Sequence, residues 1–209
     1  MLLTFDTCLD KTYVGLADGC NILGTKIIEN NGETYHSTYL MSTISNLLKE
    51  NNLTPNDITM VATDIGPGSF TGIRACMTVA RVMAQQLNIK AMGISSLEIL
   101  SKLNNSSKKT LVLLDARKSM TYVWDEEVLG AIIIDDVKEM VKAKDYSIIC
   151  DDSMYNIFSE ITDDITSYKM FNADLAKILI GIVNEKPEKA KGWRDLRPLY
   201  IQPAPVFGK

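Results

Sequence analysis

A glycine-rich turn at residues 66–72 is the first candidate for chemistry in this sequence. The turn reads GPGSFTG and leads directly into the helical pattern IRACMTVARVMAQQLN. Such a loop can present backbone N–H groups and the positive end of a helix dipole to a phosphate. The residues that could serve such a site are Gly66, Pro67, Gly68, Ser69, Phe70, Thr71, Gly72 and Arg74.

The spacing in this loop excludes two known phosphate-binding motifs. A Walker A loop has four residues between its glycines and then a lysine, whereas Gly66 and Gly72 enclose five residues and no lysine follows. The dinucleotide fingerprint requires a third glycine where Thr71 stands. Two interpretations stay open: an anion site at the helix N-terminus, or a tight turn in which Pro67 fixes φ and Ser69 or Thr71 caps the helix.

Three aspartates, Asp6, Asp64 and Asp115, each lie at or near the end of an expected strand. Kinases and nucleases set metal-bound phosphates against carboxylates in such positions. In the alternative interpretation, which we favour, each aspartate satisfies the backbone of the loop that follows it. Three arginines could meet phosphate or form salt bridges: Arg74, Arg81 and Arg117.

Cysteine and histidine offer little further chemistry. Cys8, Cys20, Cys76 and Cys150 are never closer than 12 positions, so no CxxC pair exists, and we expect reduced core residues. The single histidine, His36, has no histidine partner for a metal. For His36 we expect a role at a helix start or on the surface rather than in catalysis.

The composition predicts a globular protein. A chain of 209 residues with 46% hydrophobic residues can bury one sizeable core or two smaller ones. The net charge is −4 and no run of Lys or Arg exceeds two, so we expect no binding of nucleic acid by the chain unaided. No stretch of 18 apolar residues and no export signal is present, which predicts a cytoplasmic protein without membrane contact.

Hydrophobic periodicity predicts an α/β lobe in the first half of the chain. The expected order is three strands, a helix, a strand, a helix, a strand and a short helix, at residues 2–8, 12–19, 21–30, 36–51, 58–66, 73–88, 90–96 and 96–103. The first three strands should form two successive antiparallel hairpins. This is the order of a ribonuclease-H-like lobe.

The second half repeats this theme in a smaller form. The polar stretch at residues 104–109 is the expected boundary, giving an N-terminal lobe of residues 1–104 and a C-terminal lobe of residues 105–209. Strands are expected at 110–117, 120–125, 128–135 and 146–152, and helices at 135–143 and 173–185. Since each half opens with a strand that ends in aspartate, we infer a duplicated unit.

The helix after the glycine-rich loop has a wide apolar surface. Its polar residues fall within about 80° of the helical wheel, and one apolar face can cover the sheet through Ile73, Cys76, Ala80, Ala84 and Leu87. The remaining apolar residues, Ala75, Val79 and Val82, need another cover. That cover is the preceding helix, the second lobe or another subunit.

Several motifs resemble those of the TsaB (YeaZ) family. They are FDTC near the start, GPGSFTGIR, LNIKAMGISSLEIL, LDARKSMTYVW and RPLYIQP near the end, which together span nearly the whole chain. The resemblance implies two ribonuclease-H-like lobes of the actin, sugar-kinase and Hsp70 class, the second lobe small. It also implies a protein that supports TsaD in making threonylcarbamoyladenosine next to the anticodon of tRNA.

The same resemblance implies the partners. TsaB-like proteins pair with TsaD through helices of the first lobe, or with themselves when TsaD is missing, and the ATPase TsaE resets the complex. The corresponding partner-binding residues here are Leu40, Ile44, Ala75, Val79 and Val82. The chain would then be a non-catalytic scaffold that meets tRNA only through the complex. The rival hypothesis is an independent enzyme of this fold, a small-molecule phosphotransferase or a glycoprotease-like hydrolase.

The resemblance also bears on metals and nucleotides. TsaD holds a metal with histidines spaced four apart, and this chain has Ser96 and Leu100 in the corresponding segment, which cannot replace imidazole ligands. The second lobe lacks a glycine-pair loop for adenosine, so no cofactor is expected for the chain alone, and ATP or ADP only in the complex. Candidate contacts for a nucleotide at the joint of the lobes are Asp6, Thr7, Asp115 and Arg117.

Overall fold

The computed structural model describes residues 1–29 and 36–202, with only the backbone of residues 36–38, so the side chain of His36 lies outside the described part. The chain forms two compact units: residues Met1–Ser96 with Asp174–Leu199, and residues Leu97–Ala173 with the segment that starts at Tyr200. Of the helices in these described ranges, not one combines the length and the apolar character needed to cross a membrane.

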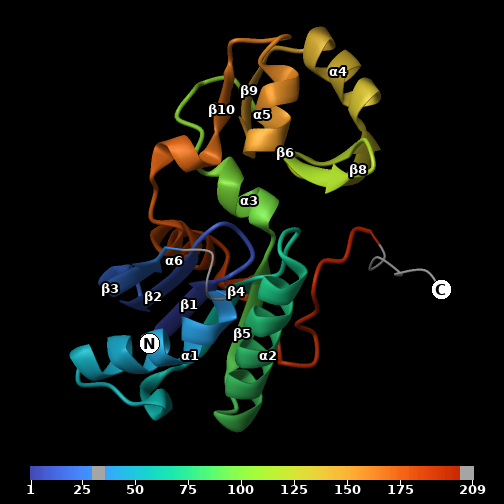
Figure 1. Ribbon diagram of the computed structural model, residues 1–209. Helices are drawn as coiled ribbons and strands as arrows, with labels where there is room; N and C mark the ends of the chain where they lie inside the picture. Colours follow the sequence, from blue (N-terminus) through green and yellow to red (C-terminus); the bar gives the residue numbers. More distant parts are fainter. Residues whose placement is uncertain (30–35, 203–209) are drawn as a thin grey trace, which may run out of the picture. The chain divides into compact units, whose positions relative to one another are not determined.

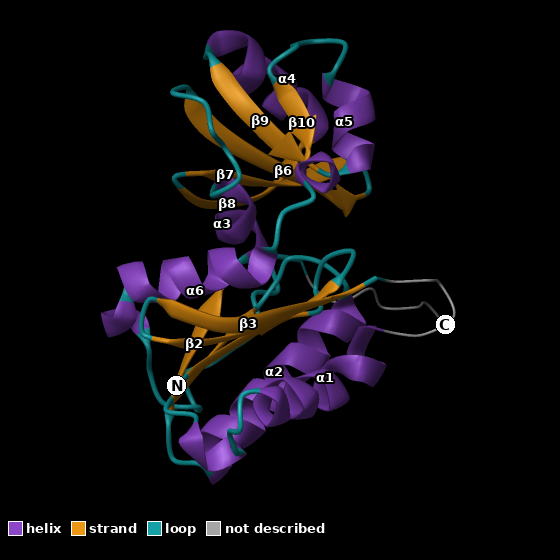
Figure 2. Ribbon diagram, turned by 90° about the vertical axis from the view of Figure 1, so that its left-hand side faces the viewer, coloured by secondary structure: helices purple, strands orange, loops and turns teal. Residues whose placement is uncertain are grey.

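The first unit is a mixed five-stranded sheet with helices on both faces (Figures 1 and 2). Its elements are β1 (Leu2–Asp6), β2 (Thr12–Asp18), β3 (Asn21–Ile28), α1 (His36–Glu50), β4 (Met60–Asp64), α2 (Phe70–Gln86), β5 (Lys90–Ile94) and α6 (Leu175–Glu185). The strand order is β3-β2-β1-β4-β5. As expected, β1, β2 and β3 form two antiparallel hairpins, and β4 lies parallel to β1 and β5.

The core of the first unit lies between this sheet and the pair α1 and α2. Alternate residues of β1, Leu3 and Phe5, are fully buried there with Leu40 and Leu47 of α1. Helix α2 contributes the residues that its sequence assigns to the sheet: Ile73, Cys76, Ala80 and Ala84 are buried, and Leu87 is partly buried. The predicted sheet-facing stripe of this helix is therefore confirmed.

Helix α6 covers the opposite face of the same sheet (Figure 2). The Thr4 hydroxyl donates to the main-chain oxygen of Ala176, and an added Cβ at Gly15 would meet Ile180 and Ala176. The expected division at residue 104, with all of 105–209 in the second lobe, is therefore wrong. The chain returns to the first unit at Asp174, because the apolar face of α6 completes the first sheet.

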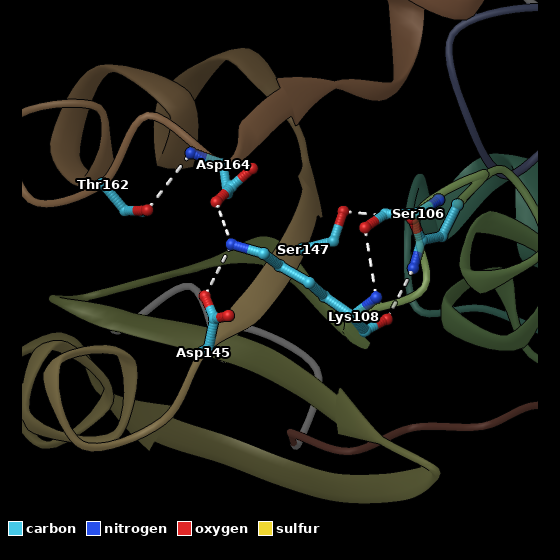
Figure 3. Close-up of polar contacts among 7 residues, drawn as sticks. Ser106, Lys108, Asp145, Ser147, Thr162 and Asp164 are labelled. Carbon is cyan, nitrogen blue, oxygen red and sulfur yellow. Dashed lines mark hydrogen bonds and ion pairs between the residues drawn. The ribbon is translucent and has the colours of Figure 1, made fainter.

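The polar stretch expected to be a linker belongs to the second unit. Asn104 donates to the main-chain oxygen of Lys108 and to Thr110, and accepts a hydrogen bond from Ser147. Lys108 forms ion pairs with both Asp145 and Asp164 (Figure 3). Because these polar groups bind their neighbours in the fold, the stretch is an ordered edge of the unit.

The second unit is a five-stranded sheet with the order β10-β9-β6-β7-β8. Its elements are β6 (Lys109–Arg117), β7 (Met120–Asp125), β8 (Glu127–Ile133), α4 (Ile134–Ala143), β9 (Tyr146–Cys150), α5 (Asp152–Phe158) and β10 (Ile165–Ser167), and α3 (Ser96–Ser101) precedes them. One core contains Leu111 and Leu113 of β6, Val137 of α4 and Phe158 of α5. The expected elements are confirmed, whereas α5 and β10 were not predicted.

Candidate functional site

The glycine-rich loop is a tight turn into α2. Gly66 has a φ of +98°, and the hydroxyl of Ser69 accepts a hydrogen bond from the Gly72 N–H at 3.2 Å. Ser69 is therefore the N-cap, one of the two residues expected to take that role, and the helix begins at Phe70 rather than Ile73.

The loop packs directly against the chain that follows β1. The Ser69 N–H donates to the Cys8 carbonyl at 2.8 Å, and the Thr7 hydroxyl donates to the Gly72 carbonyl at 2.8 Å. An added Cβ at Gly68 would overlap the Cys8 carbonyl oxygen, and one at Gly72 would overlap that of Thr7. Close backbone contacts with the chain after β1 thus hold the loop, which favours the tight-turn interpretation.

Two of the three strand-end aspartates converge. Strands β1 and β4 are parallel neighbours, so the side chains of Asp6 and Asp64 meet at the same sheet edge, and both are fully buried. Asp6 accepts the Cys8 N–H and Asp64 accepts the Gly66 N–H, each at 2.6 Å. The Ser96 hydroxyl also donates to Asp64 at 2.7 Å. Each carboxyl thus accepts a hydrogen bond from a backbone N–H of the loop that follows its strand, as the favoured interpretation states.

Burial raises the pKa of both carboxyls. The pKa of Asp6 rises to about 6, and burial together with the neighbouring Asp6 charge raises the pKa of Asp64 well above its usual value. Asp6 Oδ2 has no hydrogen-bond partner among the described residues. Desolvation thus favours the protonated form of each carboxyl relative to an exposed aspartate.

Two cysteines line this pair. One carboxylate oxygen of Asp6 and the Sγ atoms of Cys8 and Cys76 lie within 4.8 Å of one another. The Cys8 thiol donates to the Asp64 carbonyl, and the Cys76 thiol donates to Thr7, whose only proton goes to Gly72. Burial raises the pKa of the Cys8 thiol well above its ordinary value, which disfavours the thiolate that a transition metal binds.

The structure also explains the residues that replace the metal-binding histidines of TsaD. Ser96 is fully buried as a hydrogen-bond donor to Asp64, and Leu100 is fully buried. Neither side chain supplies an imidazole ligand. The described residues of this site do not fit a catalytic metal of the TsaD type.

The second unit contains a counterpart of the carboxyl pair. Asp115 in β6 accepts the Arg117 N–H at 2.7 Å, as Asp6 accepts the N–H two residues on. Its own N–H donates to Asp151, which follows β9 and caps α5 by accepting the Met154 N–H. Asp115 and Arg117 are exposed, unlike Asp6. Their role in nucleotide contact stays a prediction.

Several expected site residues lie in the core instead. Asp6 and Thr7 are fully buried and closed to a ligand, so the expected nucleotide contact is wrong for these two residues. Leu40 and Ile44 are buried in the first core and cannot meet a partner, because α1 turns them towards the sheet. Of the other expected partner-binding residues, Ala75 and Val79 are partly exposed and Val82 is 52% exposed. Two residues of the loop motif, Phe70 and Arg74, are also exposed.

The sequence analysis did not identify every side chain that contacts the two aspartates. The roles of Cys8, Cys76 and Ser96 beside the carboxyls were missed, although FDTC and GISS were noted as motifs. Three cysteines are buried as expected, whereas Cys20 is exposed. For Cys8 and Ser96 the available signal is their position two places after a strand, whereas Cys76 lies within α2.

The close contact at Gly72 predicts a strong effect of a single methyl group. Gly72→Ala should lower the free energy of unfolding by about 2–3 kcal/mol, because the methyl meets the Thr7 backbone rather than a flexible side chain. Gly181→Ala is the matched control, since its methyl enters open space within α6 and should stabilise the helix by up to about 1 kcal/mol. Urea unfolding of both variants tests this; equal stabilities would contradict the contact.

The carboxyl pair predicts a pH-dependent effect of Asp6→Asn. The raised pKa of Asp6 means that its contribution to stability is present below pH 3.8 and is lost as the pH rises through about 6. Asn keeps the acceptor for Cys8 without the charge, so the variant should gain stability relative to the parent, by about 3 kcal/mol in total.

The measurement is the difference in unfolding free energy between the variant and the parent from pH 4 to pH 8. Asp115→Asn is the control, because this exposed aspartate makes the same turn with Arg117. A difference for Asp6→Asn that does not change with pH would contradict the raised pKa of Asp6.

Comparisons with known proteins agree with this geometry. A family model described as "TsaD: tRNA N6-adenosine threonylcarbamoyltransferase" matches residues 27–152, more than half of the chain. The tRNA threonylcarbamoyladenosine biosynthesis protein TsaB of Bacillus subtilis is 28% identical over 65% of this chain and 64% of its own. The chain thus spans less than two thirds of that relative.

Two solved structures share the fold over nearly the whole chain. YeaZ from Pseudomonas aeruginosa has a TM-score of 0.71 at 19% identity and covers 95% of this chain and 98% of its own. An uncharacterized protein from Pseudomonas aeruginosa, described as similar to peptidase YEAZ, has a TM-score of 0.75 at 18% identity and covers 96% and 99%. The chain therefore belongs to the TsaD family of the matching model and, within it, to the TsaB (YeaZ) family.

Proposed function

We propose that this protein is a non-catalytic subunit in the biosynthesis of threonylcarbamoyladenosine in tRNA. In this proposal it pairs with a TsaD protein, which transfers the threonylcarbamoyl group to N6 of the adenosine next to the anticodon. The TsaE ATPase resets the complex. The name of the Bacillus subtilis relative, a tRNA threonylcarbamoyladenosine biosynthesis protein, supports the assignment of this chain to that pathway.

The observation that carries the non-catalytic role is the closure of the carboxyl site. Asp6 and Asp64 occupy the strand ends where enzymes of this fold hold metal-bound phosphate, and both are fully buried. Their oxygens accept hydrogen bonds from Cys8, Gly66 and Ser96. A phosphotransferase needs such carboxylates at the substrate, so the closed site speaks against the rival hypothesis of an independent enzyme.

A protein partner is supported by the exposed side of α2. Arg74, Thr78, Val82 and Gln85 are exposed at spacings of three and four, with the partly exposed Ala75 and Val79 beside them. We call these six residues the α2 stripe. An exposed valine flanked by small residues and few charges is typical of a protein interface. We propose that the stripe pairs with TsaD, or with a second copy of this chain when TsaD is missing.

Reconstitution tests the proposed function. The purified chain is mixed with TsaD and TsaE from the same source, a tRNA transcript, ATP and the threonylcarbamoyl donor. We expect modified adenosine only when the chain is present, and no ATP hydrolysis by the chain alone. Full modification without the chain would contradict the scaffold role, and ATP turnover abolished by Asp6→Asn would support the rival enzyme.

The α2 stripe predicts the effect of a charge at its centre. Val82→Glu should leave the melting temperature of the chain nearly unchanged, because the side chain is 52% exposed. The same change should weaken pairing with TsaD by at least about 2 kcal/mol, roughly thirtyfold, because the carboxylate is desolvated in the joint.

Ile133→Glu is the matched control, since Ile133 is also 52% exposed and lies in the second unit. Sizing of mixtures with TsaD and thermal melts of each free variant give the comparison. Pairing that is lost with Ile133→Glu and kept with Val82→Glu would place the interface on the second unit.

A further inference from the structure

The charges of this acidic protein are unevenly distributed along the chain. Residues 65–97 contain three basic residues and no acidic one, and residues 186–199 contain five basic and two acidic residues. These two segments therefore carry a net charge of +6, and the rest of the chain carries −10. A basic region in an acidic protein indicates a specific anionic partner rather than general affinity.

The fold brings the two basic segments together within the first unit. Residues 186–199, called the C-terminal strap, run along the edge strand β5 and beside α2, and are drawn in red in Figure 1. Lys191 pairs with Ala91 through both backbone hydrogen bonds, Leu196 is buried against Gly93, and the Leu199 N–H donates to Ile65. The strap is thus fixed at three points along this edge.

Two guanidinium groups contact the ring of one aromatic side chain at this place. Arg81 of α2 lies 5.5 Å from the ring centre of Trp193, and Arg194 lies 5.0 Å from it. Trp193 is partly buried against the core of the first unit, so both arginines are held against a fixed ring. Guanidinium groups held in this way can stack on bases and donate to phosphates.

The basic groups here are available to a ligand. Lys90, Lys189, Lys191, Arg194 and Arg197 are exposed and Arg81 is partly exposed. Within the described residues, none of the ion pairs includes any of these six side chains, whereas Lys26, Lys108, Lys109, Lys138 and Lys142 are all paired. We call these six residues the basic strip.

We propose that the basic strip binds the sugar-phosphate backbone of an RNA, with Arg81, Trp193 and Arg194 at its centre. The charge supplies affinity through counterion release, and the arginines held on the tryptophan supply a stacking surface for an unpaired base. An acidic protein segment would use the charge alone and would leave the arrangement of Arg81, Trp193 and Arg194 without a purpose. The choice of tRNA as the RNA rests on the proposed function, whereas the charge distribution does not.

The test measures binding of a fluorescent tRNA transcript to the full chain at several salt concentrations. The patch variant combines Lys189→Gln, Lys191→Gln and Arg194→Gln. The control variant combines Lys49→Gln, Lys138→Gln and Lys142→Gln, which removes the same charge from two exposed lysines and the partly exposed Lys138. We expect wild-type binding in the micromolar range at low salt, about tenfold weaker binding by the patch variant and a salt slope lower by about 2.

The control variant should bind within twofold of the wild type. Equal losses in the two variants, or no wild-type binding at the lowest salt, would overturn the proposal. A patch variant that binds tRNA normally and no longer pairs with TsaD or TsaE in sizing would also overturn it, and would assign the strip to an acidic protein.

Pairing with TsaD is measured in parallel with Val82→Glu. Loss of tRNA binding in the patch variant, with TsaD pairing intact, supports both proposals. The same loss in a protein that never pairs with TsaD supports the basic strip and refutes the proposed function, so the two failures are distinguishable.

Discussion

The contact between the start of α2 and the end of β1 determines most of what this site can do. Gly68 and Gly72 approach the carbonyls of Cys8 and Thr7 so closely that no side chain fits. The contact holds α2 over the sheet edge at which Asp6 and Asp64 end. The loop packs against the protein's own backbone, and both carboxyls are sealed from solvent. The glycines alone are compatible with an anion site or with a tight turn. The carbonyls of Cys8 and Thr7, which contact them in the fold, belong to residues some 60 positions earlier in the chain.

The buried carboxyl pair follows from that closure. Two carboxylates without a cation would be among the costliest groups to bury, and the nearest described partners are the neutral groups of Ser96, Cys8 and Cys76. Protonation of one carboxyl would remove one charge, and the backbone N–H groups of Cys8 and Gly66 stabilise the carboxyls. The aspartates thus serve as turn-forming acceptors, a role that exposed Asp115 performs in the second unit without burial. Aspartates at strand ends are therefore compatible with a closed, buried site.

Local sequence patterns predicted most helices and strands. They did not predict features that depend on contacts between segments distant in the sequence. The β-rich run at residues 12–18 and the periodicity of residues 73–87 are local signals, so their strand and helix were identified correctly. The apolar face of α6 is equally clear, but periodicity cannot tell which sheet it covers, and the lobe boundary was therefore misplaced. Leu40 and Ile44 were assigned to a partner, although the same spacing serves a core. The convergence of Asp6 and Asp64 depends on the pairing of β1 with β4, which no local pattern contains.

Net charge is an average over segments that the fold places in different parts of the molecule. The strap and α2 meet only because Leu196 and Leu199 anchor the chain beside β5, and this brings Arg81, Trp193 and Arg194 together. Arg81 and Val82 are consecutive on α2 and project about 100° apart around the helix. A partner seated on the α2 stripe at Val82 would therefore lie next to the strip without covering it. An RNA held along the strap would reach the edge of that partner, so one helix can serve protein pairing on one side and RNA positioning on the other.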